Sequence, residues 1–382
     1  MKIMFLINSL AIGGAERMLV KLANSEVFAG DQIIIVTLIS NTTLADELTC
    51  QNQKLISLGL TNNPLSWFKI FKLFFLMKTF KPDLIHSWLY QSDFLAGITA
   101  YFSGRKPVIW SVRQSAVSKK HNKFLTRFFI RTCAVFSHIM PAAVISNSFK
   151  GKETHISVGY ASDKIHVIPN GFDVSYFFND VAGALKFRSE IGVDKFTPLI
   201  GMISRFDSQK NYSGFFQMAK LVHERLPCAH FCLVGQEVDS INPALNAYIE
   251  NQNIDRQKIH LLGLRRDLTE IMSALDVLAL PSDGEGFPNV VGEAMACETL
   301  CVVTDVGDCA NIVGKTGKVV PVGEMYGFAS QVIDVLSKSR LRRGCMGKSA
   351  RARVKELYNI ENVAFQYKEL YERHRAKLKT RN

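Results

Sequence analysis

Short apolar runs alternate with amphipathic stretches along almost the whole chain, and this alternation constrains the fold more than any other feature. Strands that alternate with helices in this way are typical of β-α-β units on a parallel sheet. The strands are predicted at 3–7, 33–38, 84–86, 108–112, 143–146, 199–204, 230–234, 259–262, 277–280 and 300–304. The helices are predicted at 15–27, 65–80, 94–102, 212–226, 243–252, 267–273 and 289–296. We therefore expect an α/β fold with doubly wound, Rossmann-like sheets.

The 382 residues are enough for two domains that each bury their own core. The strand–helix pattern restarts after IPNGFD (168–173), a turn cluster of Pro, Asn and Gly. We expect an N-terminal domain at 1–175, a C-terminal domain at 176–358, and a helix at 359–382 that crosses back to the first domain. In such sheets, ligands bind at the carboxyl ends of the strands.

The net charge of +12 is concentrated in one stretch of the N-terminal half. Between residues 65 and 131 there are twelve Lys and Arg but only two acids, Asp83 and Asp93. This excess indicates an anionic partner: a phosphorylated lipid, a membrane surface or a nucleic acid. In 67–81 and 119–131 the basic residues interleave with Phe, Leu and Ile, a pattern of segments that lie in membrane interfaces. Alternatively, the aromatic side chains are the buried faces of ordinary domain helices.

The eight cysteines include no C-x-x-C pair, which suits buried, unpaired thiols in a reducing compartment. No targeting segment is recognised at the N-terminus. The longest uncharged run, 132–149, contains Pro141 and a predicted strand, so we do not expect it to span a membrane. These features predict a cytoplasmic protein.

Several chemistries are excluded by spacing. GKT (314–316) and GKS (347–349) resemble the ends of phosphate-binding loops, but Cys309 and Arg342 occupy the required upstream glycine positions. No G-x-G-x-x-G follows the first strand, which argues against a dinucleotide oxidoreductase. The chain has no H-E-x-x-H, G-x-S-x-G or D-x-D, and we expect neither a metal nor another cofactor.

The segment PSDGEGFPNVVGEAMAC (281–297) is the strongest candidate for a ligand site. A predicted strand ends there in a glycine-rich turn before a helix, and the positive helix end would aim amides at sugar hydroxyls or phosphate oxygens. Those amides belong to Phe287, Asn289 and Val290. Glu285 in the loop could accept hydrogen bonds from sugar hydroxyls, and Glu293 in the helix could bind a ribose. Alternatively, both are solvated surface charges, although the apolar neighbours of Glu293 argue against this.

Two further motifs follow strands. In SRFDSQKN (204–211), Arg205 and Lys210 lie on one loop, and two converging cations suit a diphosphate. In GGAER (13–17), Gly13 and Gly14 allow the backbone to approach a ligand closely at a helix N-terminus. Glu16 could simply cap that helix.

Taken in order, these motifs resemble glycosyltransferase family 4, the large retaining family with the GT-B fold. The resemblance rests on GGAER, IPNGFD, SRFDSQKN, the run Leu233 to Gly235, HLLGLRRDL (260–268) and PSDGEGFPNVVGEAMA. It runs from Met1 to about residue 370. Its most specific element is the E-x7-E pair, Glu285 and Glu293.

The resemblance implies two Rossmann-like domains facing each other across a cleft, with the acceptor on the N-terminal domain and a nucleotide-sugar on the C-terminal one. Arg205 and Lys210 would hold the donor diphosphate, while Glu293 and Glu285 would contact its ribose and its sugar. The backbone near Leu264 and Arg265 would lie on either side of the base. Gly14 would lie against the phosphates.

Two positions depart from the family pattern. Many relatives have a His after the strand at 108–112, where this chain has Arg113. Either Arg113 replaces that His, aiding the leaving phosphate or gripping an anionic acceptor, or His86 covers part of the role. His86 could equally be a structural residue. Glu298 lies where relatives usually have a Gly and then a Pro before the strand, and its role stays open.

The function expected from this resemblance is metal-independent transfer of a sugar, with retention, from a UDP-sugar to an acceptor hydroxyl. We expect a lipid-linked saccharide as the acceptor, in surface polysaccharide or glycolipid assembly, and a peripheral location on the inner face of the cell membrane. An epimerase or a phosphorylase could share the fold. A nucleic-acid-binding protein would explain the basic stretch, but its recognition motifs are absent and we expect no nucleic acid partner.

Overall fold

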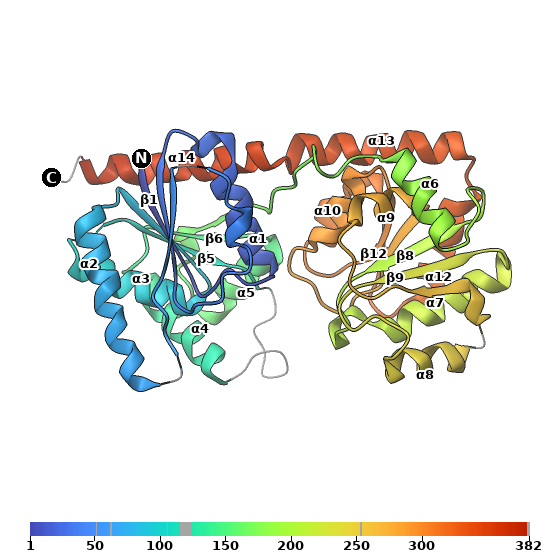
Figure 1. The fold of residues 1–382 in the computed structure, drawn as a ribbon, viewed down its shortest axis with the longest axis horizontal. Helices are drawn as coiled ribbons and strands as arrows, with labels where there is room; N and C mark the ends of the chain where they lie inside the picture. The colour runs from blue at the N-terminus through green and yellow to red at the C-terminus, as the bar shows by residue number, and fades with distance from the viewer. Residues whose placement is uncertain (51, 62, 105, 115–123, 253, 380–382) are drawn as a thin grey trace. The chain divides into compact units, whose positions relative to one another are not determined.

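The computed structural model describes residues 1–382 except 51, 62, 105, 115–123, 253 and 380–382. The chain divides into two compact units, Met1–Gly171 with Ile360–Asn382, and Phe172–Asn359. The division after Gly171 compares with a predicted boundary after residue 175. Each unit is a parallel sheet covered by helices on both faces, as the sequence pattern predicts (Figure 1).

The first unit contains a parallel sheet in the order β3-β2-β1-β4-β5-β6-β7. β1 lies between β2 and β4, with Ile3 opposite Ile33 and Leu84. Near-continuous apolar runs form the central strands because helices cover both faces of the sheet. The strands are β1 (Lys2–Ile7), β2 (Gln32–Thr37), β3 (Gln53–Ser57), β4 (Leu84–Trp88), β5 (Val108–Val112), β6 (Ala143–Ser146) and β7 (Ile165–Val167).

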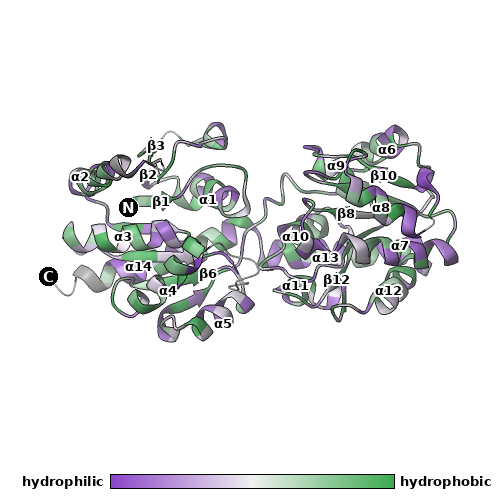
Figure 2. Ribbon diagram, turned by 90° about the horizontal axis from the view of Figure 1, so that it is seen from below, coloured by the Kyte–Doolittle hydropathy of each residue, from purple (hydrophilic) through white to green (hydrophobic). Residues whose placement is uncertain are grey.

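Helices from both ends of the chain cover this first sheet. α1 (Gly14–Asn24) and α14 (Ile360–Lys379) share one core layer, and α14 buries Tyr367 and Tyr371 completely. On the other face, α2 (Ile70–Phe80), α3 (Tyr90–Phe102) and α4 (Phe124–Ser137) form the second layer, and α5 (Phe149–Val158) follows β6. Hydrophobic and hydrophilic positions interleave along these helices, as expected where only one side faces a sheet (Figure 2).

The second unit repeats the architecture, with a parallel sheet in the order β10-β9-β8-β11-β12-β13. Its strands are β8 (Leu199–Ile203), β9 (His230–Val234), β10 (Ile259–Leu261), β11 (Val277–Leu280), β12 (Leu300–Thr304) and β13 (Lys318–Val320). One face carries α6 (Val181–Glu190), α9 (Leu268–Ala274), α10 (Asn289–Ala296), α11 (Cys309–Val313) and α13 (Arg340–Leu357). The other carries α7 (Tyr212–Arg225), α8 (Pro243–Gln252) and α12 (Met325–Ser337).

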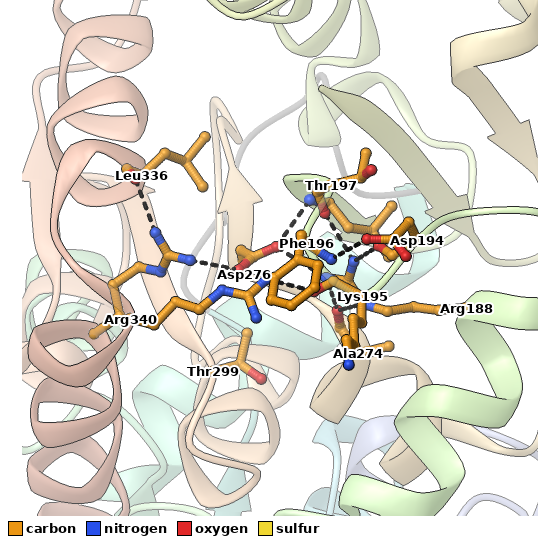
Figure 3. A network of polar contacts seen from close by, with 12 residues as sticks. Arg188, Asp194, Lys195, Phe196, Thr197, Ala274, Asp276, Thr299, Leu336 and Arg340 are labelled. Carbon is orange, nitrogen blue, oxygen red and sulfur yellow. Dashed lines mark hydrogen bonds and ion pairs between the residues drawn. The ribbon is translucent and has the colours of Figure 1, made fainter. Parts of the chain in front are cut away.

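A network around Asp276 holds the amino edge of the second sheet (Figure 3). One carboxylate oxygen accepts from the Leu199 amide (3.0 Å) and from Arg188 Nη2 (2.9 Å). The other accepts from Arg343 Nη2 at 3.1 Å, and Arg188 Nε donates to the Ala274 carbonyl at 2.9 Å. Because this well-bonded network lies at the edge opposite the carboxyl ends of the strands, we interpret it as scaffold.

The structure places Glu298 at a position where glycine is the usual residue. It directly follows Cys297, the C-cap residue of α10, and its φ is +64°. Its amide donates to the Met295 carbonyl at 3.0 Å. This is the left-handed position after a helix where glycine is the usual residue, because a Cβ makes the conformation costly.

Replacing Glu298 by Gly should raise the free energy of unfolding by about 0.5–1 kcal/mol, measured by urea denaturation. Glu298→Ala is the matched control, because both variants lose the hydrogen bond from Asn179 but only Ala keeps the strained Cβ. Equal stability of the two variants would show that the left-handed backbone carries no cost here.

Candidate functional site

Two of the predicted donor motifs follow the strands at which the order of the second sheet reverses. Strand order runs outward from β8 on one side and from β11 on the other, and in such sheets ligands bind at this switch point, beyond the carboxyl ends. The loop 204–211 follows β8, and the loop 281–288 follows β11. The two strongest sequence motifs of this unit therefore meet at one place.

Lys210 and Glu285 form a direct ion pair between these two loops. Lys210 Nζ lies 2.6 Å from Glu285 Oε1, and the side chains are 19% and 7% exposed. Ser282 Oγ donates to the same oxygen at 2.8 Å, and the Asp283 amide donates to the Gln209 carbonyl at 2.8 Å. This burial argues against Glu285 as a solvated loop charge.

Arg205 lies on the same loop as Lys210 but reaches toward solvent. Its Nε and Nη2 donate to Asp207 Oδ2 at 3.2 and 3.0 Å, and 68% of the side chain stays exposed. The other Asp207 oxygen accepts from the Gln209 amide at 2.9 Å, which fixes the turn that carries both cations. An exposed guanidinium beside this turn can reach an anionic ligand.

Helix α10 begins at Asn289, directly after the loop that holds Glu285. Phe287 is buried against Phe172, whereas Asn289, Val290 and Glu293 are half-buried along the first turns. The first amides of a helix have no partner within the helix, so this end is suited to hydroxyl or phosphate oxygens.

Gly307, which sequence reasoning missed, lets the loop after β12 approach the donor loop. Its φ is +56°, and a Cβ there would lie 2.5 Å from the carbonyl oxygens of Glu285 and Gly286. The next amide, of Asp308, donates to the Gly286 carbonyl at 3.0 Å. The signal in the sequence was a glycine three residues after the end of a predicted strand, in TDVG (304–307).

The loop after β10 carries Leu264 and Arg265, the residues expected beside the base. Leu264 is strongly exposed, although it is apolar. Arg265 instead pairs with Glu190, at 2.6 Å, and with Asp267 on its own loop. The side chain of Arg265 is therefore held by Glu190 and Asp267, and the contact predicted with the base would come from its backbone.

In the first unit, Gly13 and Gly14 follow β1 at the carboxyl edge, next to the reversal between β1 and β4. α1 begins at Gly14, one residue before the predicted start. The side chain of Glu16 folds back so closely that a Cβ on Gly13 would lie 2.3 Å from its carboxylate. Burial raises the pKa of Glu16. This contact fits the capping role left open for Glu16.

Arg113 follows β5 at the same edge and is held by uncharged groups. Its Nη1 donates to Asn170 Oδ1 and its Nη2 to Tyr367 Oη, both at 2.8 Å. Its guanidinium carbon lies 3.9 Å above the centre of the Trp88 ring. Sequence reasoning missed these partners, of which Tyr367 comes from α14.

His86 lies on β4 beneath α14 and is completely buried. Its Nδ1 lies 2.6 Å from Tyr371 Oη, and its ring packs beside Phe5 and Trp88. Burial, with the nearby charge of Arg113, holds the pKa of His86 well below its usual range. These contacts favour the structural alternative for His86.

Comparison with known families covers both units. The description Glycosyltransferase Family 4 matches residues 12–176, and Glycosyl transferases group 1 matches residues 197–338. The chain belongs to glycosyltransferase family 4. It is therefore a retaining glycosyltransferase, and the rival interpretations as an epimerase or a nucleic-acid-binding protein are not supported.

Several curated proteins are similar to this family 4 enzyme over most of its length. The UDP-Gal:alpha-D-GlcNAc-diphosphoundecaprenol alpha-1,3-galactosyltransferase of Escherichia coli is 26% identical over 308 residues, 79% of this chain and 78% of that protein. The N,N'-diacetylbacillosaminyl-diphospho-undecaprenol alpha-1,3-N-acetylgalactosaminyltransferase of Campylobacter jejuni is 26% identical over 348 residues, 86% of this chain and 89% of that protein.

Solved structures confirm the GT-B fold of the family 4 enzyme. Anabaena Alr3699/HepE in complex with UDP matches with a TM-score of 0.83 at 22% identity, covering 97% of this chain and all of that one. Sucrose-phosphate synthase from Thermosynechococcus elongatus matches with a TM-score of 0.82 at 20% identity, covering 99% of this chain and all of that one.

The structure also bears on membranes and metals. Among the described residues, no helix is long and apolar enough to cross a membrane. The uncharged run 132–149 is divided between the end of α4, the strand β6 and the start of α5. In the same described part of the chain, no group of three or more His, Cys, Asp and Glu is arranged to hold a metal ion.

Proposed function

We propose that this enzyme transfers a sugar from a UDP-sugar to a hydroxyl of a saccharide carried on a lipid diphosphate. The reaction would serve surface polysaccharide or glycolipid assembly at the cytoplasmic face of the cell membrane. The two diphosphoundecaprenol-dependent relatives named above support this acceptor class, and the first of them names UDP-Gal as its donor. The observation that carries the proposal is the ion pair of Lys210 and Glu285 at the switch point, with Arg205 on the same loop.

The cationic and the acidic donor residues have different roles. Arg205 and Lys210 bind the diphosphate, whose negative charge grows as the bond to the sugar breaks, so both cations stabilise the transition state. Glu285 contacts hydroxyls of the donor sugar. Glu293 binds the ribose hydroxyls, and the amides at the start of α10 take up further oxygens.

Acceptor activation would come from the departing diphosphate. The acceptor hydroxyl attacks the anomeric carbon from the side that the diphosphate leaves, and a phosphate oxygen takes the hydroxyl proton. This route retains the configuration of the sugar and needs positioning more than a protein base. On the acceptor side, Arg113 would bind the lipid diphosphate, because the side chains that hold its guanidinium, Asn170, Tyr367 and Trp88, are uncharged.

A thermal-unfolding panel of UDP-, GDP- and ADP-sugars tests the donor. A ligand at about 100 times its Kd adds about 2.7 kcal/mol of stability, so UDP-sugars should raise Tm while the other two classes leave it nearly unchanged. Transfer of label to an undecaprenyl-diphosphate-linked saccharide tests the acceptor, with the free saccharide as the matched control. A chain stabilised by none of these donors would contradict the proposal.

Transfer should continue in excess EDTA, because the cations Arg205 and Lys210 provide the charge that a metal supplies to other sugar transferases. The sequence also lacks the D-x-D pair that holds such a metal. The measurement is turnover with and without EDTA at saturating donor. Complete loss of turnover that Mn²⁺ or Mg²⁺ restores would contradict this prediction.

A further inference from the structure

Helix α2 and the short turn before it present aromatic side chains to solvent. Phe68, Phe71 and Phe75 are each more than 60% exposed, whereas Leu73 and Met77 face the core. The exposed residues recur three and four positions apart and therefore share one face of the helix. The alternative in which the aromatic residues form the buried face is wrong for these three positions.

Helix α4 presents a second apolar group in its first two turns. Phe124, Leu125 and Phe128 are each more than half exposed, and Ile130 and Cys133 form the buried side. Single exposed apolar residues are normal on a protein surface, but six on the outer faces of two helices in one layer call for a partner. The earlier part of the predicted segment 119–131, up to residue 123, lies outside the described residues.

Both groups lie toward the edge of the first sheet that carries Arg113. α2 connects β3 to β4, and α4 connects β5 to β6, so in this parallel sheet both helices start at the carboxyl edge. α3 packs between them, and both helices start at the lower end of this unit in Figure 1. The two apolar groups therefore flank one side of that edge.

The chain segment that contains these helices has a strongly positive net charge. From residue 48 to residue 152, the only acids are Asp83 and Asp93. Asp93 is completely buried, and Asp83 accepts from the Lys2 amide at the opposite, amino edge of the sheet. Among the described residues of 48–152, neither acid is fully exposed, whereas five basic side chains on or next to α2 and α4 are: Lys69, Lys72, Lys78, Lys81 and Arg131. Exposed aromatics among unopposed cations suit the interface of an anionic bilayer.

We propose that the outer faces of α2 and α4 insert into the headgroup region of an anionic lipid bilayer. The insertion surface consists of Phe68, Phe71, Phe75, Phe124, Leu125 and Phe128. Its purpose rests on the proposed function: binding in this orientation brings the carboxyl edge, with Arg113, to the level at which a lipid-linked diphosphate lies. Burial of aromatic area, added to charge attraction, holds the enzyme there.

Co-sedimentation of the full chain with phosphatidylglycerol vesicles tests the surface. The wild type should bind these vesicles and bind phosphatidylcholine vesicles far more weakly. Phe71→Ser with Phe75→Ser, and Phe124→Ser with Phe128→Ser, should each weaken binding by about tenfold or more. Phe365→Ser, at an exposed position on α14, is the matched control and should bind as the wild type does.

The charge component has its own pair of variants. Lys72→Glu with Lys78→Glu should weaken binding strongly at low salt, whereas Lys220→Glu with Lys348→Glu, exposed in the second unit, should not. Wild-type protein that ignores phosphatidylglycerol, or phenylalanine variants that bind as the wild type does, would overturn the inference.

Failure of this inference can be told apart from failure of the proposed function. The insertion variants should keep the UDP-sugar thermal shift, because the donor residues lie in the other unit. Donor binding without vesicle binding would overturn the insertion surface alone. Vesicle binding without any donor binding would overturn the proposed function and leave the surface in place.

Discussion

Replacing Lys210 by Met should lower kcat by about 10²- to 10³-fold while changing donor affinity much less. The ammonium stabilises charge that grows on the leaving diphosphate, and the loss of one such group typically has this effect. Arg205→Met should act in the same direction, and the double variant should lose almost all turnover. Release of UDP at saturating donor and acceptor is the measurement.

Two controls separate this effect from damage to the fold. Lys210→Met leaves the nearly buried Glu285 without its ion-pair partner, so its stability must be measured beside its turnover. Arg205 is mostly exposed, and its loss should leave stability unchanged. Lys220→Met, on the surface of α7, should be neutral in both assays. A double Arg205/Lys210 variant with wild-type turnover would remove both residues from the proposed site.

Replacing Glu293 by Ala should weaken UDP binding by about 10- to 100-fold, with a smaller effect on kcat at saturating donor. A hydrogen bond to a charged group is worth roughly 1.5–3 kcal/mol, and the ribose contact persists unchanged from ground state to transition state. Calorimetric titration with UDP measures the change. Glu250→Ala, exposed on α8, is the matched control.

A deoxynucleotide makes the Glu293 test specific to the ribose. Wild-type enzyme should bind 2′-deoxy-UDP more weakly than UDP, whereas the Glu293→Ala variant should bind the two equally. This double comparison isolates the contact between the carboxylate and the hydroxyl. The same preference for UDP in both proteins would place Glu293 elsewhere than at the ribose.

Short sequence patterns predicted the central strands and the two loops that carry Lys210 and Glu285. The central strands are continuous apolar runs, and the motifs with Lys210 and Glu285 directly follow two of them. Because neighbouring parallel strands end at the same edge of a sheet, the topology brings these two motifs close together. β3, β7 and β13 were missed. β3 is partly exposed, and β7 and β13 have only three residues each, so none forms a clear apolar run.

Long-range contacts were beyond such patterns. Tyr367 lies 254 positions after Arg113, and no local signal predicted that α14 would supply partners for Arg113 and His86. The exposed aromatic residues of α2 were ambiguous for another reason. IFKLFFLMKTF is apolar on nearly every side, so its periodicity could not show which face is buried. The strain at Glu298 comes from its positive φ, a backbone angle that could be read only from the structure.

The anomeric configuration of the product tests the central claim most directly. The enzyme would be incubated with the UDP-α-sugar that stabilises it and an undecaprenyl-diphosphate-linked saccharide, and the new linkage read by NMR. A retaining family 4 enzyme that uses the departing diphosphate as base should give only the α-linked product. A β-linked product, or release of free sugar without transfer, would contradict the account.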